Sequence, residues 1–262
     1  MTVLVFGKTG QVARELAHYS DVRCLDRAEA DLSKPAQCGR IIRRLKPAAV
    51  INAAAYTDVD GAEQDEVLAT VINGDAPAAM ALACAQMGVP FVQISTDYVF
   101  DGAGSTGFAP DHKTCPLGAY GRSKRMGERG VVAAGGTYAI LRTAWVFSRH
   151  GTNFLKTMLR LSETREQLSI VNDQIGGPTP AAAIAKACHA MAGGLASGSG
   201  RVGIYHFSGT PEVSWADFAA EIFAQSGRQV TTTGIPSQEY PTPAKRPLNS
   251  RLNCDSLQEQ FG

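Results

Sequence analysis

Short apolar runs alternate with longer segments of helix length along the first half of the chain. The runs are rich in β-branched and aliphatic residues and predict strands at residues 3–6, 22–25, 49–53, 91–95 and 138–141. Strands this apolar are expected to be covered on both faces, which is typical of parallel sheets. The pattern therefore predicts an α/β fold built on a doubly wound parallel sheet of the Rossmann type.

The rhythm changes after Trp145. We expect helices near residues 153–162 and 181–191, strands at 168–171 and 203–207, and a turn at Gly-Gly-Pro between them. A last helix follows Ser214, which has Asp217 three residues later and is a candidate N-cap. The change predicts a first domain, residues 1–150 with 178–207 returning to it, and a smaller C-terminal α/β lobe, residues 151–177 and 208–262.

The near balance of charge argues against a nucleic-acid partner. The 25 basic and 24 acidic side chains leave a formal charge of +1, and the longest basic cluster, residues 40–46, holds only four. The start of the chain has no basic leader, and no apolar run approaches the roughly 18 residues that span a bilayer. We therefore expect a cytoplasmic protein that binds neither nucleic acid nor membrane.

The six cysteines lie far apart, at positions 24, 38, 84, 115, 188 and 254. They form no Cys-x-x-Cys pair, and no histidine neighbours them at metal-ligand spacing. They indicate buried free thiols in a reducing cytosol, and no metal site is expected.

The segment after the first strand has the glycines of a dinucleotide-binding loop. Gly7 and Gly10 stand between the strand and a helical segment, which is the context that this loop requires. Glycines allow the backbone to approach a pyrophosphate, whose charge is favoured at a helix N-terminus. The spacing is Gly-x-x-Gly-x-x-Ala, and Ala13 is small enough for close packing of helix on strand. The alternative is a plain strand-to-helix turn.

Further candidates for cofactor contact follow the second and third strands. Asp26 ends the second strand, where a carboxylate accepts hydrogen bonds from the adenosine ribose and favours NADH, but the adjacent Arg27 suits the 2′-phosphate of NADPH. Both cofactors stay open. Asp31 and Leu32 offer a polar and an apolar contact to adenine, or Asp31 is a helix cap before Pro35. The small residues of 52–57 leave room for a cofactor, which would meet Ala55, Tyr56 and Thr57.

Tyr120 and Lys124 stand four residues apart and share one face if their segment is helical. A nearby cation favours a phenolate, so Lys124 is expected to lower the pKa of Tyr120 and to reach the nicotinamide ribose. Thr96 ends the fourth strand, where its hydroxyl would bind a carbonyl oxygen that gains charge during hydride transfer. These residues together predict a reductase rather than a solvated helix face.

The motifs resemble those of the extended short-chain dehydrogenase/reductase superfamily and, within it, of the dTDP-4-dehydrorhamnose reductases. The resemblance covers nearly the whole chain. Its most specific stretches are residues 7–11, 52–55, 95–100, 120–124, 143–146, 172–179 and 246–253.

The resemblance implies a role for each matching residue. Tyr120 would donate a proton to the C4 keto oxygen, with Lys124 as its electrostatic partner and Thr96 tuning it. Thr96 and Asp97 would contact the sugar, and Trp145 would pack against it. The cofactor would lie against Gly10, Gln11, Val12, Asp31, Leu32, Ala55, Tyr56 and Thr57.

The implied reaction is reduction of dTDP-4-dehydro-L-rhamnose to dTDP-L-rhamnose by NADPH or NADH, the last step in the synthesis of that sugar donor. The first domain would bind the cofactor and the lobe the substrate. Arg246 is a candidate partner for the diphosphate, because guanidinium pairs well with phosphate oxygens, or else a surface cation.

Two departures from the family pattern change the expectation. Gly118 lies two residues before Tyr120, at a position where the family often has Asn. Some members bridge a dimer with a metal held by glutamates; Glu15 matches one position, but Ala182 occupies another. A homodimer stays open, a metal bridge is not expected, and Glu15 is interpreted as a solvated helix residue.

Alternatives remain on the same fold: another sugar-nucleotide reductase, a dehydratase or epimerase, and a non-catalytic subunit. A dehydratase or epimerase recycles its cofactor, but dehydratases use Thr-Asp-Glu where this chain has Thr96-Asp97-Tyr98, without the second carboxylate. The chain also resembles the non-catalytic regulatory subunit that binds methionine adenosyltransferase. Intact Tyr120, Lys124 and Thr96 favour catalysis over that binding role.

Overall fold

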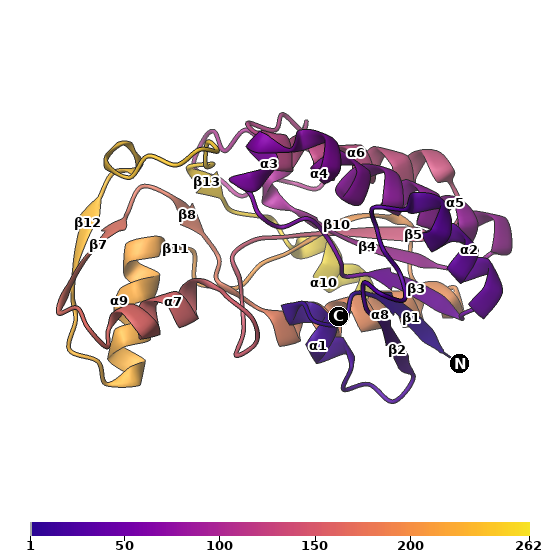
Figure 1. The fold of residues 1–262 in the computed structure, drawn as a ribbon, viewed down its shortest axis with the longest axis horizontal. Coiled ribbons are helices and arrows are strands. Elements are labelled where there is room, and N and C mark those ends of the chain that lie inside the picture. The colour runs from indigo at the N-terminus through magenta and orange to yellow at the C-terminus, as the bar shows by residue number, and fades with distance from the viewer. Residues whose placement is uncertain (1) are drawn as a thin grey trace.

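A six-stranded parallel sheet forms the centre of the larger domain in the computed structural model, which describes residues 2–262 (Figure 1). The strand order is β2-β1-β3-β4-β5-β10, so the chain reverses direction across the sheet at β1. The predicted fold class and all six long strands are confirmed. Their bounds are β1 Val3–Phe6, β2 Val22–Leu25, β3 Ala49–Asn52, β4 Phe91–Thr96, β5 Tyr138–Thr143 and β10 Gly203–Phe207.

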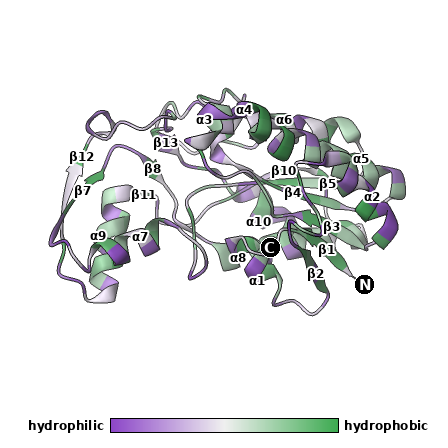
Figure 2. Ribbon diagram, viewed as in Figure 1, coloured by the Kyte–Doolittle hydropathy of each residue, from purple (hydrophilic) through white to green (hydrophobic). Residues whose placement is uncertain are grey.

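Helices cover both faces of this sheet, which explains why its strands are apolar on both sides (Figure 2). One face carries α1 (Gln11–Leu16), α8 (Ala181–Ser197) and α10 (Asp255–Phe261). The other carries α2 (Pro35–Leu45), α5 (Ala76–Met87) and α6 (Ala119–Ala134). Because α5 packs between α2 and α6 as well as over the sheet, it is apolar nearly all round.

The helical run before and through α5 is continuous from Glu66 to Met87. It comprises α4 (Glu66–Thr70), a π-helical turn η1 (Val71–Asp75) and α5, and α3 (Gly61–Gln64) precedes it. This run is long and apolar enough to cross a membrane by composition alone, contrary to the expectation that no segment reaches that length. Half of its most apolar stretch is buried inside the domain, and it contacts α2 and α6. We interpret it as a core helix.

The smaller lobe has its own apolar cluster, built between a two-stranded sheet and two helices (Figure 1). The strands are β7 (Gln167–Val171) and β12 (Thr231–Ile235), and the helices are α7 (Phe154–Leu161) and α9 (Trp215–Ser226). The predicted cap of α9 is confirmed: Ser214 accepts from the Asp217 backbone N–H, and the Asp217 carboxylate accepts from Ser214. This capping box satisfies donors at the start of the helix.

Short strands join the lobe to the domain. β6 (Val146–Phe147) pairs with β9 (Thr179–Pro180), and β8 (Ile175–Gly176) lies between β11 (Val213–Ser214) and β13 (Asn249–Ser250). Two 3-10 turns, η2 (Asp97–Val99) and η3 (Ser237–Glu239), complete the elements. The expected lobe boundary is wrong at the C-terminus, because α10 packs on α8 and β10 and places Leu257 in the core of the larger domain.

All six cysteines are free thiols. Only three are buried, so the expectation that all are buried is wrong for the other three. Cys38, Cys84 and Cys188 are buried, Cys24 and Cys254 are half-buried, and Cys115 is exposed.

Glycine allows α6 to approach the π-helical turn. A Cβ built at Gly127 would overlap the backbone carbonyl of Asn73 in η1, and one at Gly74 would stand 3.2 Å from the Met126 Cβ. Small residues on both sides therefore let the two backbones pack closely. The π-helical turn is the sort of irregularity that often marks a functional site.

We expect Gly127→Ala to lower the free energy of unfolding by about 1–3 kcal/mol, the usual cost of overpacking. Gly193→Ala, in α8, is the matched control, because a Cβ there meets nothing within 4 Å. It should raise stability by about 0.5–1 kcal/mol as glycine entropy is removed. Urea denaturation measures both, and equal effects of the two substitutions would refute the packing argument.

Candidate active site

The strand order reverses between β1 and β3, and the carboxyl ends of strands at such a reversal are where doubly wound sheets bind dinucleotides. Gly7 follows β1 with φ of 109°, a conformation that side chains rarely adopt. A Cβ there would stand 3.2 Å from the Ala53 carbonyl carbon, so glycine also permits close approach to the end of β3. Gly10 is the N-cap of α1 and supplies no side-chain cap, leaving first-turn N–H groups free for an anion.

The next two residues of the loop are divided between solvent and core. Val12 is buried against the sheet, whereas Gln11 is half-buried and reaches across to the loop at 148–153. The Gln11 side-chain oxygen accepts from Ser148 Oγ and Asn153 Nδ2, both at 2.8 Å. The loop after β1 is thereby bonded to the segment that leads into the smaller lobe.

Asp26 lies at the end of β2 on the surface. Its Oδ1 accepts from the backbone N–H groups of Ala28 and Glu29, and its Oδ2 lies 3.3 Å from Lys8 Nζ. These bonds and the Lys8 cation hold the pKa of Asp26 below its ordinary value. A carboxylate and the cations Lys8 and Arg27 therefore share the position where ribose or its 2′-phosphate would bind.

Asp31 does not cap α2, because Lys34 is the N-cap and Asp31 instead accepts from the Ser33 N–H at 3.0 Å. This bond lowers the pKa of Asp31. The alternative role as a helix cap is wrong. Leu32 is 7% exposed and belongs to the core cluster beneath α2, so little of its side chain is available to adenine.

Ala55, Tyr56 and Thr57 follow β3, and Asn73 of η1 fixes the middle one. The Asn73 amide accepts from the Tyr56 N–H at 2.8 Å and donates to the Tyr56 carbonyl at 3.0 Å. Its Nδ2 also donates to Ser123 Oγ on α6 at 3.0 Å. Sequence reasoning missed Asn73, since its role depends on a helical irregularity that no motif signals.

α6 begins one residue before Tyr120, and its cap comes from a distant segment. Gly118 is the N-cap without a side chain, and Glu63 Oε1 accepts from the Ala119 N–H at 2.7 Å. A Cβ on Gly118 would overlap the Glu63 carboxylate. The departure at Gly118 therefore makes room for a charged cap from α3, which is favourable at a helix N-terminus.

The side chains at the carboxyl end of β4 face Tyr120. Thr96 and Asp97 are buried, and Thr96 Oγ1 donates to Asp97 Oδ1 at 3.1 Å. The ring of Tyr98 meets that of Tyr120 edge to face with centroids 5.5 Å apart. The structure thus brings Tyr120, Thr96 and Asp97 together, as the sequence predicted.

The expected effect of Lys124 on Tyr120 is wrong. Burial and the Asp97 charge raise the pKa of Tyr120 to about 12, while the Thr96 hydroxyl opposes that rise. Lys124 Nζ donates to the Ile94 carbonyl at 2.7 Å instead. Burial lowers the pKa of Lys124 to about 8, and Glu128 one turn later in α6 counteracts this. Tyr120 is therefore a neutral phenol at physiological pH, the form that a proton donor requires.

A buried ion pair holds the back of α6 against the sheet. Both nitrogens of the Arg142 fork, Nε and Nη2, donate to the Glu128 carboxylate at 2.8 and 2.7 Å, and Ser95 Oγ donates to it at 2.6 Å. Arg142 also contacts His206 Nε2 at 3.3 Å on β10. Sequence reasoning missed this network, which connects three strands and the helix that carries Tyr120.

Trp145 and Arg246 lie at the boundary between domain and lobe. The Trp145 ring stacks on Trp215 of α9 with centroids 3.5 Å apart and planes 10° apart. Arg246 Nη2 donates to Asp60 Oδ2 at 2.6 Å, while its Nη1 is buried without a partner. Trp145 therefore packs against the lobe, and Arg246 is already paired with a carboxylate.

Comparisons with known proteins agree with this geometry. The protein-family profile described as RmlD substrate binding domain matches residues 1–262. The dTDP-4-dehydrorhamnose reductase of Burkholderia thailandensis is 45% identical over all of this chain and 93% of its own. A crystal structure of a dTDP-4-dehydrorhamnose reductase from Clostridium acetobutylicum superposes with a TM-score of 0.94, at 36% identity over 100% of this chain and 93% of that one.

A further solved structure adds a cofactor. The dTDP-4-dehydrorhamnose reductase of Bacillus anthracis, solved in complex with NADP, has a TM-score of 0.93 and 33% identity over 99% of this chain and 93% of its own. Whole-length similarity at these identities establishes the family.

Asp97 generates a prediction on stability and pH. Burial raises the pKa of Asp97 to about 6, and its Oδ2 has no hydrogen-bond partner. A raised carboxyl pKa means that the folded state binds this proton more tightly than the unfolded state does. The free energy of unfolding therefore falls as the pH rises from about 4 to about 6. Asp97→Asn keeps a neutral side chain and should raise the free energy of unfolding at pH 7.5 by about 1–3 kcal/mol.

Urea denaturation at pH 7.5 and pH 4 measures this effect. The gain should vanish at pH 4, where Asp97 is protonated in the folded protein. Exposed Asp111→Asn is the control and should change stability little at either pH. A stabilisation by Asp97→Asn that is equal at both pH values would contradict the assigned burial of charge.

Proposed function

Because the chain belongs to the dTDP-4-dehydrorhamnose reductase family of the extended short-chain dehydrogenase/reductases, we propose that it reduces dTDP-4-dehydro-L-rhamnose to dTDP-L-rhamnose with NADPH or NADH. One observation carries the proposal: the Tyr120 phenol, the Thr96 hydroxyl and the Asp97 carboxyl meet at the end of β4, beside the crevice at β1 and β3. That is the edge of a doubly wound sheet where ligands bind. The free cysteines fit a reducing, cytoplasmic location.

Tyr120 acts as the proton donor. The reduced nicotinamide supplies hydride to C4 of the sugar when it is bound. The keto oxygen then gains negative charge and takes the proton of Tyr120, whose pKa of about 12 keeps the phenol protonated beforehand. The Thr96 hydroxyl donates to Asp97 beforehand and then turns its one proton to the phenolate that remains, since its hydrogen bond lowers the pKa of Tyr120.

Lys124 supplies positive charge on the same face of α6. Its pKa of about 8 leaves the ammonium mostly protonated at pH 7. The Ile94 carbonyl and Glu128 hold it below the end of β4. In this proposal it donates to the nicotinamide ribose and does not lower the pKa of Tyr120.

The residues of the crevice fit a dinucleotide. Gly7 allows the backbone to approach the pyrophosphate, and Gly10 leaves the first N–H groups of α1 free to bind it. Asp26 faces the adenosine ribose. The remaining contacts in the proposal come from Gln11, Val12, Asp31, Leu32, Ala55, Tyr56 and Thr57. Of these, Leu32 contributes only its exposed edge, because its side chain is nearly buried.

Thr96 and Asp97 contact the sugar in this proposal, and Trp145 closes its far side. Trp145 is partly exposed and is held in place by its stack on Trp215. Arg246 is not assigned to the diphosphate, because Asp60 already pairs with it and the Ala244 N–H donates to the same carboxylate. Its role is to fasten the 244–246 segment to the start of α3.

The geometry disfavours elimination and pure binding. A dehydratase needs a second acid-base group beside Asp97, but Tyr98 occupies that position and burial raises its pKa above the ordinary phenol value. A non-catalytic binding subunit would not require Tyr120, Thr96 and Lys124 in mutual reach. Reduction uses all three.

Tyr120→Phe should lower kcat by about 10²–10⁴-fold, the usual contribution of a positioned proton donor, while the affinity for reduced cofactor changes little. Oxidation of NADPH with dTDP-4-dehydro-L-rhamnose measures turnover, and quenching of tryptophan fluorescence measures cofactor affinity. Tyr138→Phe, at the opposite end of β5, is the matched control and should keep kcat. Unchanged turnover by Tyr120→Phe would refute the mechanism.

Asp26→Asn should raise the ratio of kcat/KM for NADPH over NADH by about tenfold, equivalent to about 1.4 kcal/mol. The substitution removes the charge that opposes a 2′-phosphate and leaves Lys8 and Arg27 beside the site. Glu29→Gln is the control, because the Glu29 carboxylate is a neighbouring charge that pairs with Arg23 and accepts from the Asp26 backbone N–H but does not pair with Lys8. An equal shift in the control would show a general charge effect and contradict a ribose contact by Asp26.

A further inference from the structure

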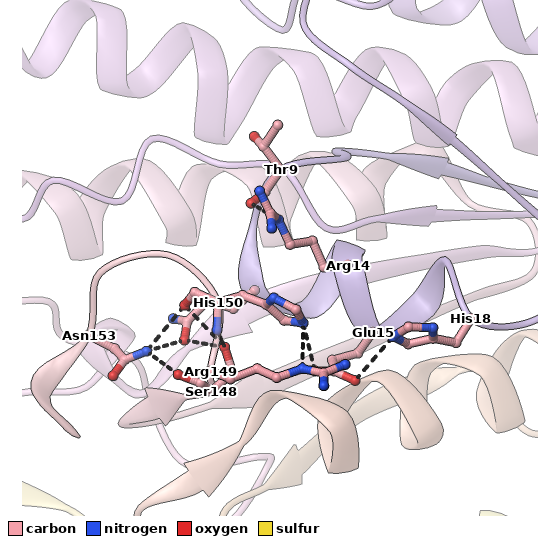
Figure 3. Close-up of polar contacts among 9 residues, drawn as sticks. Thr9, Arg14, Glu15, His18, Ser148, Arg149, His150 and Asn153 are labelled. Atoms are coloured by element: carbon pink, nitrogen blue, oxygen red, sulfur yellow. Dashed lines mark hydrogen bonds and ion pairs between the residues drawn. The ribbon is translucent and has the colours of Figure 1, made fainter. Parts of the chain in front are cut away.

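Three side chains of metal-ligating type converge where α1 faces the loop at 148–153. Glu15 lies between the other two, with Oε1 3.2 Å from His150 Nε2 and Oε2 4.0 Å from His18 Nε2 (Figure 3). The three ligand atoms all lie within 4.8 Å of one another. Glu15 is therefore not the solvated helix residue that the sequence suggested, since its side chain is only 16% exposed.

We propose that Glu15, His18 and His150 bind a divalent transition-metal ion of the zinc class. Two imidazoles and one carboxylate form a recurring zinc ligand set, with water as the fourth ligand. Mg²⁺ and Ca²⁺ prefer oxygen ligands throughout, so the imidazoles select against them.

The geometry requires only a small adjustment. Ligand atoms at about 2.0–2.2 Å from a tetrahedral ion stand about 3.4 Å apart. Glu15 and His150 already meet this spacing at 3.2 Å. His18 must close the remaining gap, and its side chain is 62% exposed and free to rotate toward the ion.

His150 is held in position independently of any ion. Its backbone N–H donates to Ser148 Oγ at 3.0 Å, and Ser148 Oγ donates to Gln11 Oε1 at 2.8 Å. Asn153 Nδ2 donates to the same Gln11 oxygen (Figure 3 shows the loop). The loop is thus bonded to Gln11 of α1. These bonds hold His150 opposite Glu15 before any ion binds.

The space beside the cluster suits a water ligand. A shallow hollow of about 200 Å³ borders Glu15 and His18 and is completed by Tyr19, Ala182 and Ala185. The alanines contribute no ligand atoms. One chain therefore supplies all three ligands, and the site does not need a second copy of the protein, unlike a metal that bridges a dimer.

Arg149 competes with the ion. Its Nε donates to His150 Nε2 at 3.3 Å, and this is the ring nitrogen that would bind the ion. The Arg149 side chain is exposed and can leave to solvent. Metal binding replaces a weak hydrogen bond and removes a cation from beside the site.

Calorimetric titration of Zn²⁺ into the untagged, chelator-stripped full chain tests the proposal. We expect one ion per chain, and Glu15→Gln and His150→Ala should each weaken binding by about tenfold or more, at least the effect of losing a secondary contact. Arg149→Ala should bind Zn²⁺ as tightly as the unmodified chain or more tightly, since it removes the competing donor. Co²⁺ in place of Zn²⁺ should give the visible absorption of a four-coordinate ion.

His189→Asn is the matched control. His189 is a nearby imidazole paired with Asp21 at 3.0 Å but outside the cluster, so its loss should leave the affinity unchanged. Thermal melts establish that each variant is folded. Absence of Zn²⁺ binding, unchanged affinity in His150→Ala, or Mg²⁺ binding as strong as Zn²⁺ binding would overturn the proposal.

Discussion

The Asn73 amide is the interaction on which the active site depends. It is 1% exposed and bonds both backbone groups of Tyr56 while donating to Ser123 on α6. Ser123 Oγ in turn donates to the Tyr120 carbonyl at 2.8 Å. One side chain thereby fixes the loop after β3 relative to the helix that carries Tyr120. Leaving any of these buried groups unpaired costs about 1–3 kcal/mol, so the register of loop and helix is strongly specified.

Asn73 lies in the π-helical turn η1, which holds one more residue than a turn of α-helix. From this turn its amide bonds both Tyr56, which follows β3, and Ser123 on α6. Gly127 lets the carbonyl of Asn73 lie against α6 without a clash. The π-helical turn, Gly127 and the Asn73 amide together form the contact between η1 and α6.

The sequence predicted what depends on local pattern. The strands of the main sheet are short apolar runs, and Ser214 with Asp217 forms the capping box that its spacing indicated. The helix start at Gly118 was unpredictable, because its cap is Glu63, 56 residues away along the chain. The pKa of Tyr120 was wrongly predicted for a related reason: spacing placed a cation on the same face, but burial and Asp97 outweigh it. Burial is a property of the packed domain, so no local motif reports it.

The site also combines groups that are unfavourable for folding, and the surrounding structure compensates for them. Asp97 and Lys124 are both buried. Burial raises the pKa of Asp97 and lowers that of Lys124, so it favours the neutral form of each. Trp145 adopts φ of 49°, a left-handed conformation that costs a bulky residue about 1–2 kcal/mol. Its stack on Trp215 and the absence of a Cβ at Gly176, where one would meet the indole at 2.7 Å, hold it there. Because Trp215 begins α9, the packing of the lobe is what holds Trp145 in this strained conformation. The fold of the lobe therefore determines the orientation of Trp145, the residue that we propose packs against the sugar.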